Sequence, residues 1–115
     1  MEVEMPLVPQ KSNTTKPDYS TVQRAWWDAV LKCYEHSKAC PQRMPLEMRI
    51  MGGSEVTMAP QRGNELGTCS IEVLTTESAV GIWKEYAQEV LDKWMSYTDG
   101  EGKRLRTRPH WAKEW

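Results

Sequence analysis

The sequence predicts an α+β fold in which a small antiparallel sheet is covered on one face by two helices. Two amphipathic helical patterns and two short alternating patterns along the 115 residues support this prediction. They occur in the order helix, strand, long loop, strand, helix, so the two strands are expected to pair and the helices to bury the apolar side of the sheet. The other face of the sheet would remain available to a ligand or to another domain.

The first helix is expected at 20–36, where Ser20 and Gln23 fit a capping box and apolar residues recur at helical spacing. The second helix follows Thr76, Glu77 and Ser78, which supply a cap and first-turn acidity, and the glycine-containing segment 99–102 breaks it. The apolar stripes are Val22, Trp26, Ala29, Val30 and Cys33 in the first helix, and Ala79, Trp83, Tyr86, Ala87, Val90 and Trp94 in the second.

Apolar and polar residues alternate over 46–51 and again over 69–73, which is the pattern of a half-buried strand. Gly52 and Gly53 end the first strand. Residues 54–67 contain Pro60, Gly63 and Asn64 with little periodicity, so they predict a long loop of the kind that often carries function.

Residues 1–18 are expected to form a flexible leader or linker, because Pro6, Pro9 and Pro17 are combined there with a polar run. Residues 19–115 would then form the folded part. A chain of 115 residues can form one compact domain but is short of what a complete dinucleotide-binding oxidase needs.

Composition and charge exclude several functions. The net charge of −1 gives no overall attraction to nucleic acid, and no apolar run approaches the roughly 20 residues that span a bilayer. With no secretory signal pattern at the amino terminus, we expect an intracellular protein. Cys33, Cys40 and Cys69 are expected to be free thiols, and the spacing of Cys33, His36 and Cys40 matches no standard zinc site, so no metal is expected.

Glu47 and Arg49 form the first candidate site. Residues two apart on a strand project from the same face, about 7 Å from each other, so an acceptor and a multidentate donor would lie side by side. Such a pair suits a polyhydroxylated substrate. The alternative is a solvated strand face carrying a modest ion pair.

The carboxyl-terminal segment 108–113 forms the second candidate site. Its sequence Arg-Pro-His-Trp-Ala-Lys follows the basic residues Lys103, Arg104 and Arg106 and favours anions. Arg49, His110 or Lys113 could supply a positive charge that stabilises a reduced, anionic flavin ring. The alternatives are a solvated basic tail whose indoles pack on the domain surface, and nucleic-acid binding, which the acidity of the remaining chain disfavours.

Three segments resemble the aldonolactone oxidase family, the D-arabinono-1,4-lactone and L-gulonolactone oxidases within the vanillyl-alcohol-oxidase-type flavoproteins. Residues 45–49 are similar to the Glu-x-Arg strand of the family, residues 67–72 to its Thr-Cys-x-Ile strand, and residues 108–113 to its terminal His-Trp-x-Lys segment. The order and relative position of the three segments agree with the family. The resemblance covers residues 20–115 and corresponds to the carboxyl-terminal portion of these enzymes, so it implies that residues 19–115 form an incomplete cap or carboxyl-terminal domain.

The resemblance implies an FAD-dependent oxidase that converts a carbinol of a sugar 1,4-lactone or polyol to a ketone, with hydride transfer to the flavin and reoxidation by oxygen. It implies catalytic roles for Glu47, Arg49 and Lys113, and contacts of Arg49, His110, Trp111 and Lys113 with the flavin. The sequence contains no glycine-rich pyrophosphate motif, so most of the FAD would be bound by a separate domain, in cis or in trans. The alternative is a non-catalytic truncated product or a protein-interaction module. The resemblance leaves membrane association and mitochondrial localisation open.

Overall fold

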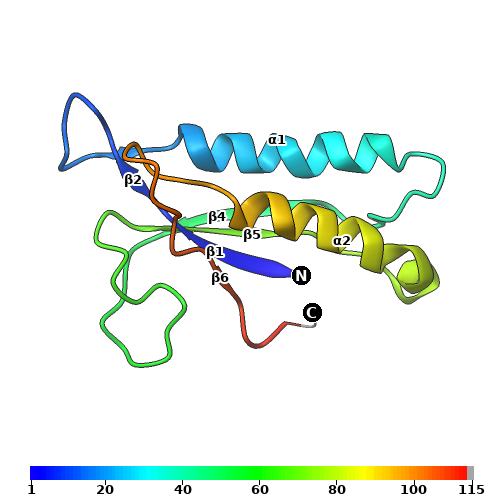
Figure 1. Cartoon of the computed structure of the whole chain (residues 1–115). Coiled ribbons are helices and arrows are strands. Elements are labelled where there is room, and N and C mark those ends of the chain that lie inside the picture. The colour runs from blue at the N-terminus through cyan, green and yellow to red at the C-terminus, as the bar shows by residue number, and fades with distance from the viewer. Residues whose placement is uncertain (114–115) are drawn as a thin grey trace.

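The computed structural model describes residues 1–113 and confirms the predicted α+β class, with a four-stranded antiparallel sheet, a two-stranded ribbon and two long helices (Figure 1). Both helices lie on one side of the large sheet, as the amphipathic patterns predict. The elements in chain order are β1 (Glu2–Pro6), β2 (Val8–Pro9), β3 (Pro17–Asp18), α1 (Ser20–Glu35), β4 (Glu47–Met51), β5 (Thr68–Glu72), the 3₁₀ turn η1 (Glu77–Ala79), α2 (Val80–Met95) and β6 (Arg108–Pro109).

The strands of the large sheet lie in the order β4-β5-β1-β6, so the first strand of the chain occupies an interior position. β1 pairs with β5 over its whole length and with β6 over two residues. β4 pairs with β5 and forms one outer strand, which confirms that the two predicted strands are neighbours. The ribbon of β2 and β3 connects β1 to α1.

The core lies between the sheet and the two helices. Side chains of β1 and β5 pack there against α1 and α2, as expected when alternate residues of a strand face the same layer. Two buried aromatic side chains of α2 also satisfy their polar atoms, because Trp94 Nε1 donates to the carbonyl of Ala25 at 2.9 Å and Tyr86 Oη donates to Gln42 Oε1 at 2.8 Å. The Trp94 bond joins α2 to α1, and the Tyr86 bond joins α2 to the segment that follows α1.

The expectation of a flexible leader at 1–18 is wrong for its first part. Glu2–Pro6 form β1, and Val3 and Met5 are completely buried in the core. The physical reason is the alternation Glu-Val-Glu-Met, which places two apolar side chains on the helix side of the sheet and two carboxylates on the other. The proline-rich composition outweighed this short pattern in the prediction.

The first helix occupies nearly the expected range, but its capping box does not form. The side chain of Ser20 caps nothing; instead, the backbone N–H of Ser20 donates to Asp18 Oδ1 at 2.8 Å, so a residue two positions earlier satisfies the helix start. Thr76 likewise makes no capping hydrogen bond at the start of η1.

The predicted long loop is confirmed as irregular structure between β4 and β5. It ends at Gly67, whose φ of 107° and 2.9 Å approach between an added Cβ and the Met51 carbonyl oxygen both require glycine. The loop is tied to the strands by Gln61 Nε2, which lies 3.3 Å from Met51 Sδ, and by Arg108 Nη1, which donates to the carbonyls of Pro60 and Arg62 at 2.7 Å.

Candidate functional site

The face of the sheet opposite the helices is polar. The register places Glu47, Glu72 and Glu2 side by side across three strands, and Arg49, Ser70 and Glu4 in the next row. Directly opposed residues of an antiparallel pair project from the same face, so all six side chains belong to one surface. This surface, defined by these six residues, is called the polar face below.

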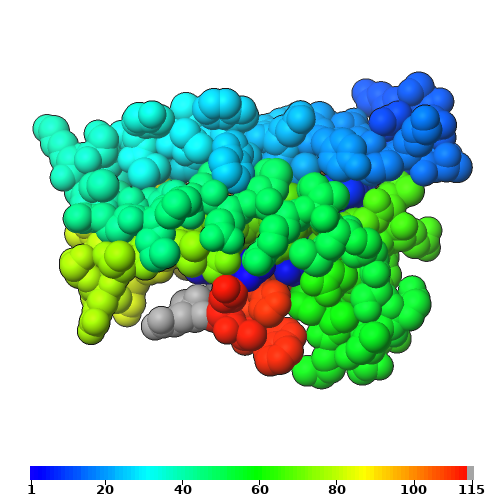
Figure 2. All heavy atoms as spheres, turned by 180° about the vertical axis from the view of Figure 1, so that it is seen from behind, coloured from blue at the N-terminus to red at the C-terminus, as the bar shows by residue number. Residues whose placement is uncertain are grey.

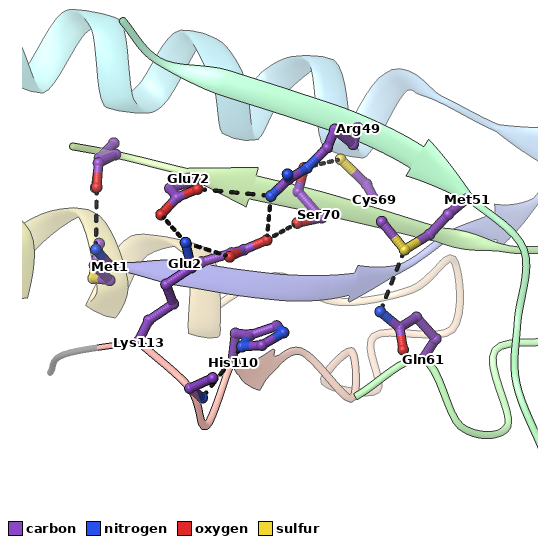
Figure 3. A network of polar contacts seen from close by, with 12 residues as sticks. Met1, Glu2, Arg49, Met51, Gln61, Cys69, Ser70, Glu72, His110 and Lys113 are labelled. Atoms are coloured by element: carbon purple, nitrogen blue, oxygen red, sulfur yellow. Dashed lines mark hydrogen bonds and ion pairs between the residues drawn. The ribbon is translucent and has the colours of Figure 1, made fainter. Parts of the chain in front are cut away.

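Two cations converge on two carboxylates of the polar face (Figure 3). Arg49 Nη2 lies 2.7 Å from Glu2 Oε1 and 3.6 Å from Glu72 Oε2. Lys113 Nζ lies 2.7 Å from Glu72 Oε1 and 3.4 Å from Glu2 Oε2. Ser70 Oγ donates a further hydrogen bond to Glu2. Arg49 and Lys113, from the two motifs singled out in the sequence, therefore share the same pair of acceptors.

The carboxylates of Glu2 and Glu4 differ in how their burial is compensated. Burial alone would raise the pKa of Glu2, but the Ser70 hydrogen bond and the charges of Arg49 and Lys113 outweigh it, so this pKa lies below its ordinary value. The pKa of Glu4 is raised, first by burial and then by the negative charge of Glu2. Glu4 Oε2 has no hydrogen-bond partner within residues 1–113. The polar face thus holds one well-paired carboxylate beside one whose pKa is raised and whose Oε2 is unpaired within residues 1–113.

The carboxyl-terminal segment reaches this face because β6 pairs with the outer edge of β1, with Val3 opposite Pro109 and Glu4 opposite Arg108. The backbone N–H of His110 continues this pairing by donating to the Glu2 carbonyl at 2.9 Å. A turn closed by the N–H of Lys113 and the carbonyl of His110 at 3.0 Å then directs Lys113 back over the polar face. Backbone pairing, and not charge alone, therefore places Lys113 over the polar face.

The structure brings together some of the predicted site residues and separates others. Glu47 is exposed at the margin of the polar face, in the row of Glu72 and Glu2. His110 lies on β1's edge close to the carboxylates, and its ring stacks on that of Trp111 with centroids 6.0 Å apart. Trp111 itself is 68% exposed and makes no part of the ion-pair cluster.

Sequence reasoning missed Glu2, Glu4, Ser70 and Glu72 as members of the site. Glu2 and Glu4 alternate with Val3 and Met5, which is the signal that could have identified both the strand and its polar side. The alternation of Ser70 and Glu72 with apolar residues was visible in the predicted strand, yet nothing in the sequence indicated which residues oppose them.

A shallow groove of about 560 Å³ runs along β4, between the strand and α1, beside the polar face. Its lining mixes one indole, three apolar side chains and the two charged residues of the first candidate site; the residues are Trp26, Leu46, Glu47, Met48, Arg49 and Ile50. Glu47 and Arg49 therefore lie where a small polar molecule could touch both an apolar wall and a charged pair.

The other candidate features within residues 1–113 are a metal site, reactive thiols and a membrane-spanning helix. No group of three or more His, Cys, Asp or Glu side chains is arranged there to hold a metal ion. Cys33, Cys40 and Cys69 are free in the structure, which confirms the thiol prediction, and burial raises the pKa of Cys69 to about 12. No helix in this part of the chain has the length and apolar character needed to cross a bilayer.

Comparison with known proteins adds no relative: no family model matches the chain, and no significant match was found among curated proteins or solved structures.

Proposed function

We propose that this chain is the substrate-facing part of an FAD-dependent oxidase of sugar 1,4-lactones, similar to D-arabinono-1,4-lactone oxidase. A separate FAD-binding domain, in cis or in trans, would hold most of the cofactor. One observation carries the proposal: Arg49 and Lys113, from two motifs far apart in the sequence, meet over Glu2 and Glu72 on the polar face. Both motifs resemble those of the aldonolactone oxidases.

The exposed donors of this cluster fit one edge of a flavin ring. The Arg49 side chain is 52% exposed, and the Lys113 side chain is 36% exposed. Arg49 makes its carboxylate contacts through Nη2, whereas a guanidinium carries five N–H donors in all. Such donors suit the electron-rich carbonyl edge of the ring or an oxygen of the substrate.

The remainder of FAD does not fit this chain. The sequence has no GxGxxG or P-loop motif to bind a pyrophosphate, and the groove along β4 is open and shallow. When bound by the complementary domain, the flavin would supply the acceptor for a hydride from the carbinol carbon. The contribution of this chain is therefore confined to substrate positioning and to donors at one edge of the ring.

The roles of the chain's own residues follow from their exposure and partners. Glu47, exposed beside the groove, would accept hydrogen bonds from substrate hydroxyls. Arg49 and Lys113 would donate to oxygens that gain negative charge during the reaction. Glu2 and Glu72 are positioning residues, because they hold both cations in one geometry before substrate binds. They also offset the two positive charges, so directed donors, more than net charge, would stabilise the transition state.

The test is complementation of a D-arabinono-1,4-lactone oxidase from which the residues resembling this chain have been removed. Its FAD-binding remainder is mixed with this chain and FAD, and flavin absorbance and lactone-dependent hydrogen peroxide are measured. We expect turnover with the wild-type chain, and a loss of at least about tenfold with Glu47→Gln or Arg49→Met, since each removes a transition-state contact. Glu101→Gln, at an exposed turn, is the matched control. No turnover in any combination would overturn the proposal.

A non-catalytic interaction module is the second candidate, and one observation favours it. The cluster of Arg49, Lys113, Glu2 and Glu72 contains two cations and two carboxylates, so it can serve simply to fasten the carboxyl-terminal segment onto the sheet. Under this alternative, the chain would bind a partner protein without any turnover, and Glu47→Gln would leave partner binding unchanged.

A further inference from the structure

The outer edge of β4 is an open sheet edge. β4 is the terminal strand in the order β4-β5-β1-β6, and its residues are half-buried or exposed. In Figure 2, β4 lies at the molecular surface in the green segment between α1 and the carboxyl-terminal segment. Open edges present unpaired backbone groups and are sites at which another strand can add.

The register identifies which backbone groups point outward. Met1 and Val73 exchange hydrogen bonds between β1 and β5, and Leu7 donates to Gly67 in the same ladder. Bonded pairs alternate along an antiparallel ladder, so odd-numbered residues of β5 bond β1 and even-numbered ones bond β4. Through the pairs of β4 with β5, Glu47, Arg49 and Met51 then direct their backbone groups inward. Met48 and Ile50 direct theirs to the open edge.

The helix-facing side of this edge is unusually apolar for a surface. Ile50 is 48% exposed, and Trp26, Leu46 and Met48 line the adjoining groove. On α1, Trp27 is 60% exposed and Tyr34 is 72% exposed. At about 100° per residue, these two side chains lie roughly 100 to 160° around the helix from Asp28 and Lys32, which contact the α2 side. They lie roughly 120 to 180° from the buried Val22, Ala25 and Ala29 and therefore face solvent, so the apolar surface that adjoins the β4 edge is the groove of Trp26, Leu46 and Met48 with Ile50.

We propose that this edge pairs with the same edge of a second copy of the chain, as an antiparallel β4–β4 contact whose two-fold axis passes through Met48. In this register, the backbone of Met48 forms hydrogen bonds with Met48 of the second copy. Leu46 of each copy forms backbone hydrogen bonds with Ile50 of the other, so every outward backbone group of β4 is used. The paired sheets form one continuous sheet of twice the size. A two-fold contact of this kind uses the same surface on both partners, so each favourable contact occurs twice.

Charge complementarity selects this register and a second copy as the occupant. Glu47 lies opposite Arg49 of the other copy, twice, while Leu46 lies opposite Ile50 on the apolar side, also twice. An axis at Glu47 would oppose Glu47 to itself, and an axis at Arg49 would oppose Arg49 to itself. Both of these registers thus place like charges opposite each other. Of the three registers, only the one centred on Met48 places opposite charges together.

The experiment measures oligomeric state by sedimentation equilibrium under reducing conditions, from about 1 µM to about 1 mM of the 115-residue chain. We expect a reversible monomer–dimer equilibrium. Glu47→Arg replaces both attractive pairs with repulsive ones and is expected to weaken the dimer by at least about tenfold. Glu85→Arg makes the same charge change on the exposed side of α2 and is the matched control, expected to leave the dissociation constant unchanged.

A second variant tests the strand contact without altering the Glu47–Arg49 pairs. Ile50→Lys places a charge at an exposed edge position and is expected to give a monomer at all concentrations, with an unchanged circular dichroism spectrum. A wild-type chain that stays monomeric throughout the range would overturn the proposal, and so would a dimer that tolerates Glu47→Arg or Ile50→Lys. No flavin or substrate is present, so the result is independent of the proposed oxidase function.

Discussion

Glu2 and Glu4 lie two residues apart on the same strand and face, yet their environments have opposite effects on ionisation. The pKa of Glu2 is lowered because Ser70, Arg49 and Lys113 together outweigh the effect of burial, whereas the pKa of Glu4 is raised by burial and by Glu2 itself. A lowered pKa stabilises the fold above the unfolded value of about 4.5, and this contribution is lost as pH falls through the folded pKa. A raised pKa has the reverse effect and penalises the fold at neutral pH.

Glu4→Gln tests that penalty at a single residue. The substitution keeps the shape and removes the charge that burial disfavours, so we expect the free energy of unfolding at pH 7 to rise by on the order of 1 kcal/mol. The gain should shrink as pH falls through the raised folded pKa toward about 4.5, and it should be absent below that value, where glutamate becomes protonated in both states. Urea unfolding at several pH values measures it, with the exposed Glu101→Gln as control. A less stable Glu4→Gln protein at pH 7 would mean that the Glu4 charge is compensated in the folded state.

A site residue was predictable when a sequence pattern within its own strand indicated its position. Glu47 and Arg49 could be placed on one face because strand side chains alternate, and that prediction agrees with their register positions. The meeting of Arg49 with Lys113 was inferred from resemblance alone, since it depends on β6 pairing with β1. Glu2 was missed for the same reason: its partners come from β4 and the carboxyl-terminal segment, and no local pattern encodes such contacts.

At the scale of elements, β1 shows how composition can conceal a short strand. Prolines at positions 6, 9 and 17 favour irregular structure, but the four residues before Pro6 alternate between polar and apolar. Pro6 ends the strand, which is a position where its missing N–H is tolerated. The helices were predictable because each had a longer repeated pattern, whereas β4 and β5 are no longer than β1 and differ from it in that no proline-rich run follows them directly.

Two substitutions within residues 1–18 distinguish a buried strand at the start of this segment from a flexible leader. Met5 is completely buried among the core side chains, so Met5→Ala is expected to lower the free energy of unfolding by about 2–5 kcal/mol. Thr15→Ala lies in the exposed connection between β2 and β3, and we expect an effect within about 0.5 kcal/mol. Denaturant unfolding compares the two variants. Equal, small effects at both positions would contradict the interior placement of β1.

At the scale of the whole molecule, the sheet separates two kinds of stabilisation. The helix side is an apolar core of buried side chains from β1, β5, α1 and α2, and its existence follows from amphipathic patterns in the sequence. The other side is a polar surface closed by the carboxyl-terminal segment through backbone pairing and ion pairs. Its construction required long-range pairing that no periodicity indicates, so the fold class was predictable while the strand order was not.

A chain ending at Thr107 tests whether the carboxyl-terminal segment only adds stability to the fold or is required for folding. Truncation removes β6, the bond from His110 to the Glu2 carbonyl and the Lys113 ion pairs, but leaves β4, β5, β1 and both helices intact. We expect a folded protein whose free energy of unfolding is lower by about 1–3 kcal/mol, mainly through lost backbone bonds. Lys113→Met alone should cost less than about 1 kcal/mol, because Lys113 is partly exposed and Arg49 remains beside both buried carboxylates. Without Lys113, the folded pKa of Glu2 rises toward its ordinary value, so both variants should begin to lose stability at a higher pH during acid titration. Circular dichroism with urea unfolding from pH 7 to about pH 3 follows both quantities, and a truncated chain that is fully unfolded at pH 7 would show instead that the polar face is as necessary as the core.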